Sequence, residues 1–343
     1  MSDIMKLSVC NIILIVCTIS LIFSSCVKEK ISVGQASRSA TVDLNFSALG
    51  ESSGTEADAP LEDNENFKTL RVLITDESSK VLKNAFEDFS SQGGKDSYSM
   101  RIPNLPQNEP LNFYVIGNEA SVNIDKDLSS LTPGESFLPA GFLETLMKNN
   151  GERAFPKMRN QINETGLPIT GKLTTTLPLE NNSMNIECTH SVVKVVLNIN
   201  NIMTESFWIN KISLGSFVPD RGFLFPQNEI IVPNDADVSS YDFIAQTDGI
   251  TVNQGENKSA FVFYMYETES QKNNYTLALT SPTISKLSES RYIFGEGTEN
   301  VTLKRNTQLN INATVNVHKD VEVTIKYEVK PWTPATIVVP PFN

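Results

Sequence analysis

Two consecutive stretches near the end of the printed sequence alternate apolar and polar residues without interruption. In 309–317 every odd-numbered residue is apolar and every even-numbered residue is polar. The same alternation holds in 321–330, with charged residues or threonine at the even positions. Successive side chains of a strand point to opposite faces of a sheet, so a period of two predicts half-buried β-strands. Two such strands in succession favour an antiparallel sheet with one face on a core.

Shorter runs of the same kind are spread along the chain. In 41–48, Val42, Leu44 and Phe46 lie on the apolar side of a predicted strand. Two segments favour short helices, 80–89 and 142–147, because apolar residues fall on one helical face. The prediction is an all-β fold with a few short helices, built of antiparallel sheets packed as sandwiches. Further strands are predicted at 67–74, 111–117, 192–199, 260–267 and 275–280. Residues 168–179 are rich in threonine and proline, and a domain boundary is expected near their end.

The first 25 residues predict an export signal, because Lys6 precedes a long apolar stretch that ends in small residues. The end of the stretch, Phe23-Ser24-Ser25-Cys26, resembles a bacterial lipobox. There the signal is cut before the cysteine, which then carries acyl chains such as palmitate. We therefore expect lipidation of Cys26 and anchoring in the outer membrane. An ordinary signal peptide and a permanent membrane span are the alternatives, and Asn11 within the stretch argues against the span.

Charge and cysteine use narrow the function classes. A formal net charge of −12 argues against nucleic acid as a partner, because phosphate binding needs a basic face. Of the four cysteines, only Cys188 lies beyond residue 26, so no internal disulfide is expected in the exported chain. Cys188 and His190 share one face of a predicted strand. They are interpreted as two semi-buried strand residues rather than as a catalytic thiolate couple.

Two apparent ligand motifs fail on inspection. Residues 166–173 have the spacing of a phosphate-binding loop, but Leu173 stands where the magnesium-binding hydroxyl belongs. Residues 125–136 begin like a calcium loop, yet lack its glycine and its final glutamate. The chain has only two histidines and no cluster of histidine and cysteine. No metal, cofactor or catalytic residue is predicted, and we expect no enzyme activity.

Five stretches together resemble the fimbrillins, the lipoprotein-derived pilus subunits of Bacteroidetes (type V pili). They run in the same order along nearly the whole chain: the lipobox at Cys26, ATVDLNFSA with the acidic loop after it, FKTLRVLITDESSKVL, PITGKL…HSVVKVVLNI, and FVFYMYET…LKRNTQLNINATVN…KYEVKPWT. The resemblance implies two tandem transthyretin-like β-sandwich domains. The expected division is a signal at 1–25, a lipidated N-terminus with a leading strand at 26–66, and domains at 67–180 and 181–343.

The resemblance also implies assembly into a surface fimbria that serves adhesion. In such pili a leading strand fills a groove in its own subunit until a protease removes it, and the next subunit's C-terminal strand replaces it. Here the leading strand would present Val42, Leu44 and Phe46. The candidate donor strand lies in 333–343, with Ile337, Val339 and Phe342 as plugs. The alternative is that this segment completes its own sandwich. The implied partners are other fimbrial subunits, the outer membrane and a receptor on a host or bacterial surface.

One departure from the family pattern bears on position in the fibre. Many members are cut at an arginine in the loop after the leading strand, whereas this chain has no arginine between Ser39 and Lys68. The candidate cleavage site, Arg38, precedes the strand, so a cut there would leave the groove filled. We therefore expect an anchor or accessory subunit rather than the shaft. A tip adhesin is a variant of this interpretation, and the other class is a surface glycan-binding lipoprotein, for which Trp208 and Trp332 are the only tryptophans.

Overall fold

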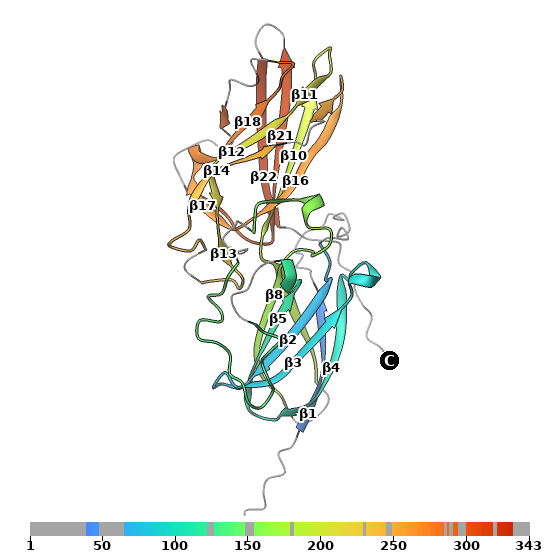
Figure 1. Cartoon of the computed structure of the whole chain (residues 1–343), viewed down its shortest axis with the longest axis vertical. Helices are drawn as coiled ribbons and strands as arrows, with labels where there is room; N and C mark the ends of the chain where they lie inside the picture. The colour runs from blue at the N-terminus through green and yellow to red at the C-terminus, as the bar shows by residue number, and fades with distance from the viewer. Residues whose placement is uncertain are drawn as a thin grey trace, which may run out of the picture.

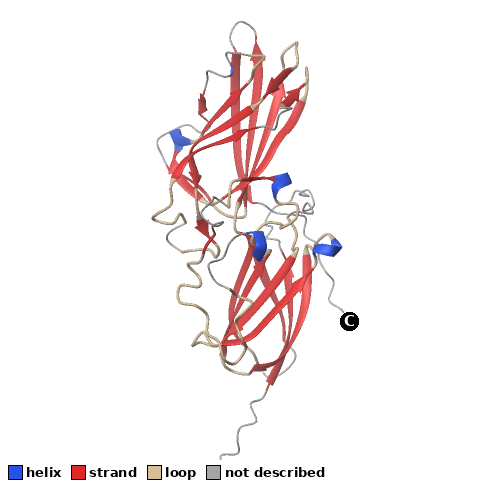
Figure 2. Ribbon diagram, in the orientation of Figure 1, coloured by secondary structure: helices blue, strands red, loops and turns tan. Residues whose placement is uncertain are grey.

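The computed structural model describes most of the chain between Ser39 and Pro331. Figure 1 shows two lobes along the long axis, and Figure 2 shows that both consist almost entirely of strands. Among the described residues, no helix is long and apolar enough to cross a membrane. The described ranges are 39–47, 65–121, 127–147, 154–178, 182–228, 231–244, 249–284, 287, 291–293, 300–317 and 321–331.

The first lobe is one hydrogen-bonded set of seven strands in the order β3-β2-β5-β8-β9-β1-β4. Strand β9 joins its two parts, because 182–187 pair with β1 while Cys188 to His190 pair with β8. Gly171 lies at this crossing, where a Cβ atom would sit 2.7 Å from the Glu187 carbonyl oxygen. Only glycine therefore lets the two strands approach. The strands are β1 (Ser39–Ser47), β2 (Thr69–Thr75), β3 (Val81–Asp88), β4 (Ser97–Pro106), β5 (Pro110–Gly117), β8 (Ile169–Thr176) and β9 (Asn182–His190).

The predicted all-β class is confirmed, but both predicted helices are wrong. Residues 81–88 form β3, which pairs antiparallel with β2 from Thr69↔Asp88 to Thr75↔Val81. In the other segment, Leu146–Met147 form β6, which pairs with β13 (Gly222–Phe223). Short apolar runs fit either period, and here pairing with a neighbouring strand decides the conformation. The described helical elements are single 3₁₀ turns: η1 (Ser90–Gln92), η2 (Glu119–Ser121), η3 (Arg159–Gln161) and η4 (Lys272–Asn274).

The second lobe packs a five-stranded sheet, in the order β22-β21-β10-β16-β7, against a four-stranded sheet, in the order β14-β12-β18-β19. The alternating segments at 309–317 and 321–330 are confirmed as the strands β21 and β22, which pair antiparallel over their whole length. The strands are β7 (Lys157–Met158), β10 (Val193–Asn201), β11 (Phe207–Ile209), β12 (Lys211–Pro219), β14 (Val238–Ile244), β15 (Ile250–Val252), β16 (Asn257–Met265), β17 (Thr268–Gln271), β18 (Thr276–Thr280), β19 (Arg291–Ile293), β20 (Asn300–Leu303), β21 (Thr307–Val317) and β22 (Val321–Pro331).

Each lobe has its own apolar core, and a further buried cluster joins the two. The joining cluster takes Tyr114 from β5, Phe155 from the connecting loops, and Phe225, Tyr264 and Tyr266 from the second lobe. The expected boundary at residues 180 and 181 falls before β9, which stays in the first sheet. We propose that the lobes divide at Ser191 instead, between β9 and β10.

A buried ion pair links the connection between β16 and β17 to the connection between β20 and β21. Arg305 and Glu267 are each 7% exposed, with 2.6 Å between Nη2 and Oε2. The guanidinium also donates to the carbonyl oxygens of Leu224 and Phe223, both at 2.8 Å. Removing one partner of such a pair leaves the other charge buried without compensation.

We expect Arg305→Met to lower the free energy of unfolding by about 3–5 kcal/mol. The matched control is Lys211→Met, which breaks an ion pair with Asp242 whose side chains are 39% and 49% exposed. That change should cost no more than about 1 kcal/mol. Chemical denaturation of both variants measures the difference, and equal losses would contradict the assignment.

Candidate functional site: the groove filled by the first strand

The first strand of the fold, β1, lies in the interior of its sheet (Figure 1). It pairs antiparallel with β4 from Ser39↔Pro106 to Ser47↔Ser97. On its other side it pairs parallel with β9 from Val42↔Asn182 to Ser47↔Glu187. In the described part of the chain, β4 pairs in the sheet only with β1. The strand predicted from the alternation in 41–48 therefore links an edge strand to the rest of the lobe.

The inward face of β1 is fully buried. Ala40, Val42, Leu44 and Phe46 are each no more than 1% exposed. They pack in the core of the first lobe with Met100 and other residues of β4, β2, β5 and β9. Burying one large apolar side chain stabilises a fold by roughly 1.5–3 kcal/mol. Loss of the whole strand would open this core along its length.

The outward face of β1 is tied to both neighbours by Asn45. The side-chain oxygen of Asn45 accepts a hydrogen bond from Ser99 Oγ on β4 at 2.7 Å. Its Nδ2 donates to Asn185 Oδ1 at 3.1 Å and to Ser183 Oγ at 3.3 Å, both on β9. The amide thus spans the groove from wall to wall. By contrast, the exposed pair of Asp43 and Arg101, at 3.8 Å, contributes little.

The described chain resumes after β1 at Glu65, which is 1% exposed at the junction of the lobes. Its Oε1 lies 2.6 Å from Lys194 Nζ and accepts a hydrogen bond from the Tyr264 hydroxyl at 3.0 Å. Its carbonyl oxygen lies 2.8 Å from His190 Nε2, which must carry the proton because a carbonyl can only accept. Lys194 lies on β10 and Tyr264 on β16, and both strands belong to the second lobe.

A second contact fixes the residues that follow. The Asn118 side-chain oxygen accepts hydrogen bonds from the backbone of Lys68 and Thr69, at 2.6 and 3.1 Å. Its Nδ2 donates to the carbonyl oxygens of Asn66 and Leu167, at 2.9 and 2.7 Å. The chain from Glu65 onward is therefore held by the body of the protein, independently of β1. Sequence reasoning missed both Glu65 and Asn118, and a glutamate at the end of an acidic loop gave no signal of burial.

Several residues singled out in the sequence lie outside the described residues. These are the lipidation site Cys26, the candidate cleavage site Arg38, the candidate donor residues Ile337, Val339 and Phe342, and Trp332. Their roles stay predictions.

The cysteine and histidine of β9 have different surroundings. Cys188 lies in the apolar core of the first lobe, and burial raises the pKa of its thiol. The ring of His190 faces the junction, where Nδ1 lies 3.3 Å from Asn306 Oδ1. A buried, protonated thiol is a poor nucleophile. Both are strand residues, as the sequence favoured, but they are fully buried and not semi-buried.

The ligand-like motifs also have structural roles. Residues 169–173 of the apparent phosphate loop lie in β8, between β5 and β9. Asp127, from the apparent calcium loop, accepts hydrogen bonds from the backbone and hydroxyl of Ser129. Among the described residues, no group of three histidine, cysteine or acidic side chains is arranged to hold a metal.

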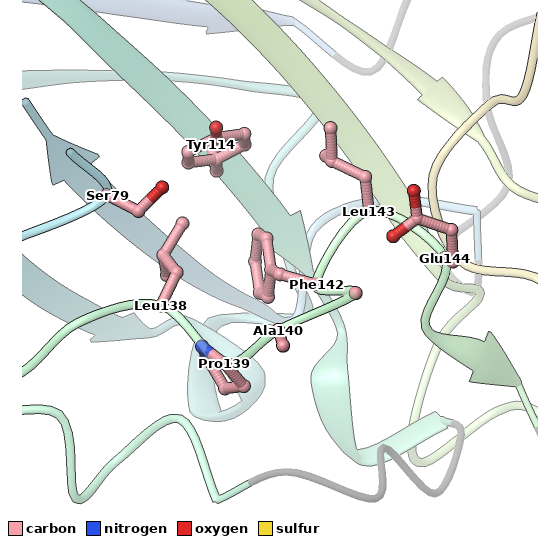
Figure 3. Close-up of a pocket in the computed structure, with 9 residues that line it drawn as sticks. Ser79, Tyr114, Leu138, Pro139, Ala140, Phe142, Leu143 and Glu144 are labelled. Carbon is pink, nitrogen blue, oxygen red and sulfur yellow. The ribbon is translucent and has the colours of Figure 1, made fainter. Parts of the chain in front are cut away.

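A shallow pocket of about 250 Å³ lies beside β5 (Figure 3). It is lined by Ser79, by Tyr114 and by residues 138–144. The rings of Tyr114 and Phe142 pack edge to face at 5.2 Å, and both are nearly buried. Trp208 is partly buried, and a Cβ atom on Gly249 would collide with its indole nitrogen. The rings of Tyr114 and Phe142 pack against protein and form no open platform for a sugar ring.

The fold matches solved bacterial surface proteins. One is a candidate cell adhesion protein from Parabacteroides distasonis, with 15% identity and a TM-score of 0.55 over 88% of this chain and 99% of that one. Another is the C-terminally truncated tip fimbrial protein Mfa3 from Porphyromonas gingivalis, with 14% identity and a TM-score of 0.51 over 86% of this chain and 100% of that one. No family model and no curated protein matches the sequence. The likeness shows that this chain has the all-β fold of Bacteroidetes fimbrial proteins.

We expect Phe46→Ala to lower the free energy of unfolding by about 3–5 kcal/mol, because it leaves a cavity in the core beneath β1. Asp43→Asn, on the opposite face of the same strand, should change it by less than about 0.5 kcal/mol. Urea denaturation of the two variants provides the measurement. A small loss for Phe46→Ala would mean that β1 contributes little to the core.

Stability should also depend on His190 in mildly acidic solution. Burial lowers the pKa of His190 below its usual value, although hydrogen bonds to Glu65 and Asn306 oppose this. The unfolded chain therefore takes up a proton near pH 6.5 that the folded chain refuses, so stability falls as the pH drops below that value. The slope can reach about 1.4 kcal/mol per pH unit. His190→Gln should flatten the curve between about pH 6.5 and 5.5, and an unchanged curve would exclude His190 as its source.

Proposed function

We propose that this chain is a structural subunit of a cell-surface fimbria, assembled by exchange of strands between subunits and serving adhesion. The observation that carries the proposal is β1. It is an interior strand at the start of the fold, and it is held by its neighbours through noncovalent contacts on both edges and one face. Such a strand can be replaced by another of similar pattern, since main-chain hydrogen bonds supply affinity and alternate side chains set the register.

The fixed position of Glu65 supports the same proposal. Glu65 binds Lys194 and Tyr264 in the second lobe. The chain that follows β1 would therefore stay attached to the rest of the subunit when β1 leaves. The fimbrial and cell-adhesion proteins that share this fold point to the cell surface as the location. Lipidation at Cys26 would hold the chain in the outer membrane, with β1 retained because no arginine follows it before Lys68. In that state the chain donates a strand but accepts none, which fits an anchor or accessory subunit.

The proposed donor strand is tested by Val339→Asp. The change should abolish incorporation into fimbriae, because a charged side chain would have to enter an apolar groove. The melting temperature of the monomer should stay within about 1 °C of the parent, a shift of less than about 1 kcal/mol in a chain this long. The matched control is Val338→Asp, which faces the other side of an extended strand and should still be incorporated. Loss of monomer stability with incorporation intact would show instead that the segment completes its own sandwich.

The state of the N-terminus is tested by mass spectrometry of the protein isolated from outer membranes. A chain beginning at acylated Cys26 is expected for the anchor or accessory role. A chain beginning between residues 50 and 66 would mean that β1 is removed, and the subunit would then polymerise in the shaft.

A further inference from the structure

We propose that the groove now filled by β1, once vacated, takes a strand from a different polypeptide and rejects residues 333–343 of a second copy of this chain. The inference rests on the proposed exchange of strands and names the kind of partner that the site accepts. It follows from what β1 supplies to its two neighbours and from what the segment at 333–343 lacks.

The groove sets a backbone requirement on both sides. Eight residues of β1 pair with β4, from Ser39 to Ser47 with a register shift between Ala40 and Val42, and six pair with β9, Val42 to Ser47. Along an interior strand, the N–H and C=O groups of successive residues point alternately to one neighbour and to the other. An occupant must therefore offer a backbone N–H at each position of the ladder, because a missing donor leaves a buried carbonyl unpaired.

The groove also sets a side-chain pattern. Every second position is buried, and the four sites hold Ala40, Val42, Leu44 and Phe46 in that order. Between the last two, Asn45 bridges from Ser99 to Ser183 and Asn185. The four buried positions thus hold, in order, a small residue, a β-branched residue, a leucine and an aromatic residue. A side chain with an amide group stands just before the aromatic residue.

The segment at 333–343 fits the first part of this pattern and fails in the second. Ala335-Thr336-Ile337-Val338-Val339 follows Ala40-Thr41-Val42-Asp43-Leu44 in its inward-facing residue types. Pro340 and Pro341 then stand where Asn45 and Phe46 stand in β1. A proline has no N–H, and in sheets it is confined to edges and bulges.

The mismatch holds in either direction and in every register that places the two prolines opposite both neighbours. Because successive residues face opposite neighbours, two adjacent prolines at the positions of Val42 to Ser47 remove one hydrogen-bond donor toward β4 and one toward β9. Pro334 limits the segment on its other side, so the run without proline is 335–339. The nine residues of β1 include no proline.

The accepted partner is therefore a strand of at least about eight residues without proline. Its apolar residues alternate from small to aromatic, and a side chain with amide or hydroxyl groups precedes the aromatic residue. By the same argument, residues 333–343 suit a groove whose ladder is shorter than this one. Copies of this chain then join other subunits and do not form a fibre of their own.

The experiment uses the full chain from residue 26, with a specific protease site placed at 52–57. After cutting, labelled peptides compete with β1 for the groove during a mild denaturant pulse, and fluorescence anisotropy measures binding. The peptides are 39–47, 333–343, and 333–343 with Pro340→Asn and Pro341→Phe. A reciprocal control is 39–47 with Asn45→Pro and Phe46→Pro.

The expected result is exchange of peptide 39–47 and of the altered 333–343 peptide. Native 333–343 and the proline control should bind at least about 100-fold more weakly, the effect of two or more unpaired buried groups. Native 333–343 binding within about tenfold of 39–47 would overturn the inference and leave strand exchange intact. Failure of the altered 333–343 peptide alone would overturn the assignment to the prolines. Failure of 39–47 to exchange would instead overturn strand exchange at this groove, on which the inference rests, and would leave the anchor role, in which β1 is retained, intact.

Discussion

The hydrogen-bond ladders on both edges of β1 are the constraint on which the first lobe depends. β4 reaches the sheet through β1, and the core beneath is closed by its four buried side chains. A body without β1 would expose two rows of unpaired backbone groups and an open core, both of which are costly in water. An empty groove is therefore a poor resting state, and departure of one strand must be coupled to arrival of another.

The junction between the lobes explains how one strand could leave without loosening the rest. Glu65, with Lys194 and Tyr264, fastens the chain that follows β1 to the second lobe. The joining cluster around Phe155, Phe225 and Tyr266 buries apolar surface from both lobes. Neither feature uses a residue of β1, so the contacts that join the two lobes do not depend on that strand.

The sequence predicted strands correctly where one face of the strand is buried and the other is exposed to solvent. The strands β1 and β21 were predicted because their alternation directly reflects that geometry, and the same alternation in the sequence predicted β22. Residues 80–89 misled, since their apolar spacing fits a helical face as well as an edge strand whose burial is only partial. That β9 belongs to the first sheet could not be predicted, because nothing local shows that β9 pairs with β1, far away in the chain. The contacts between the lobes could not be predicted for the same reason. Glu65 and Tyr264, hydrogen-bonded at 3.0 Å, are 199 residues apart in sequence.

The pairing of β1 with two neighbours along its length also has a mechanical consequence. Its hydrogen bonds run across the strand, toward β4 on one side and β9 on the other. A force pulling on one end along the strand axis would have to slide β1 past both neighbours, so the bonds of both ladders share the load. A strand peeled from an edge would instead give way one bond at a time. The filled groove is thus built to resist tension along the strand, the load that a surface filament bears in flow.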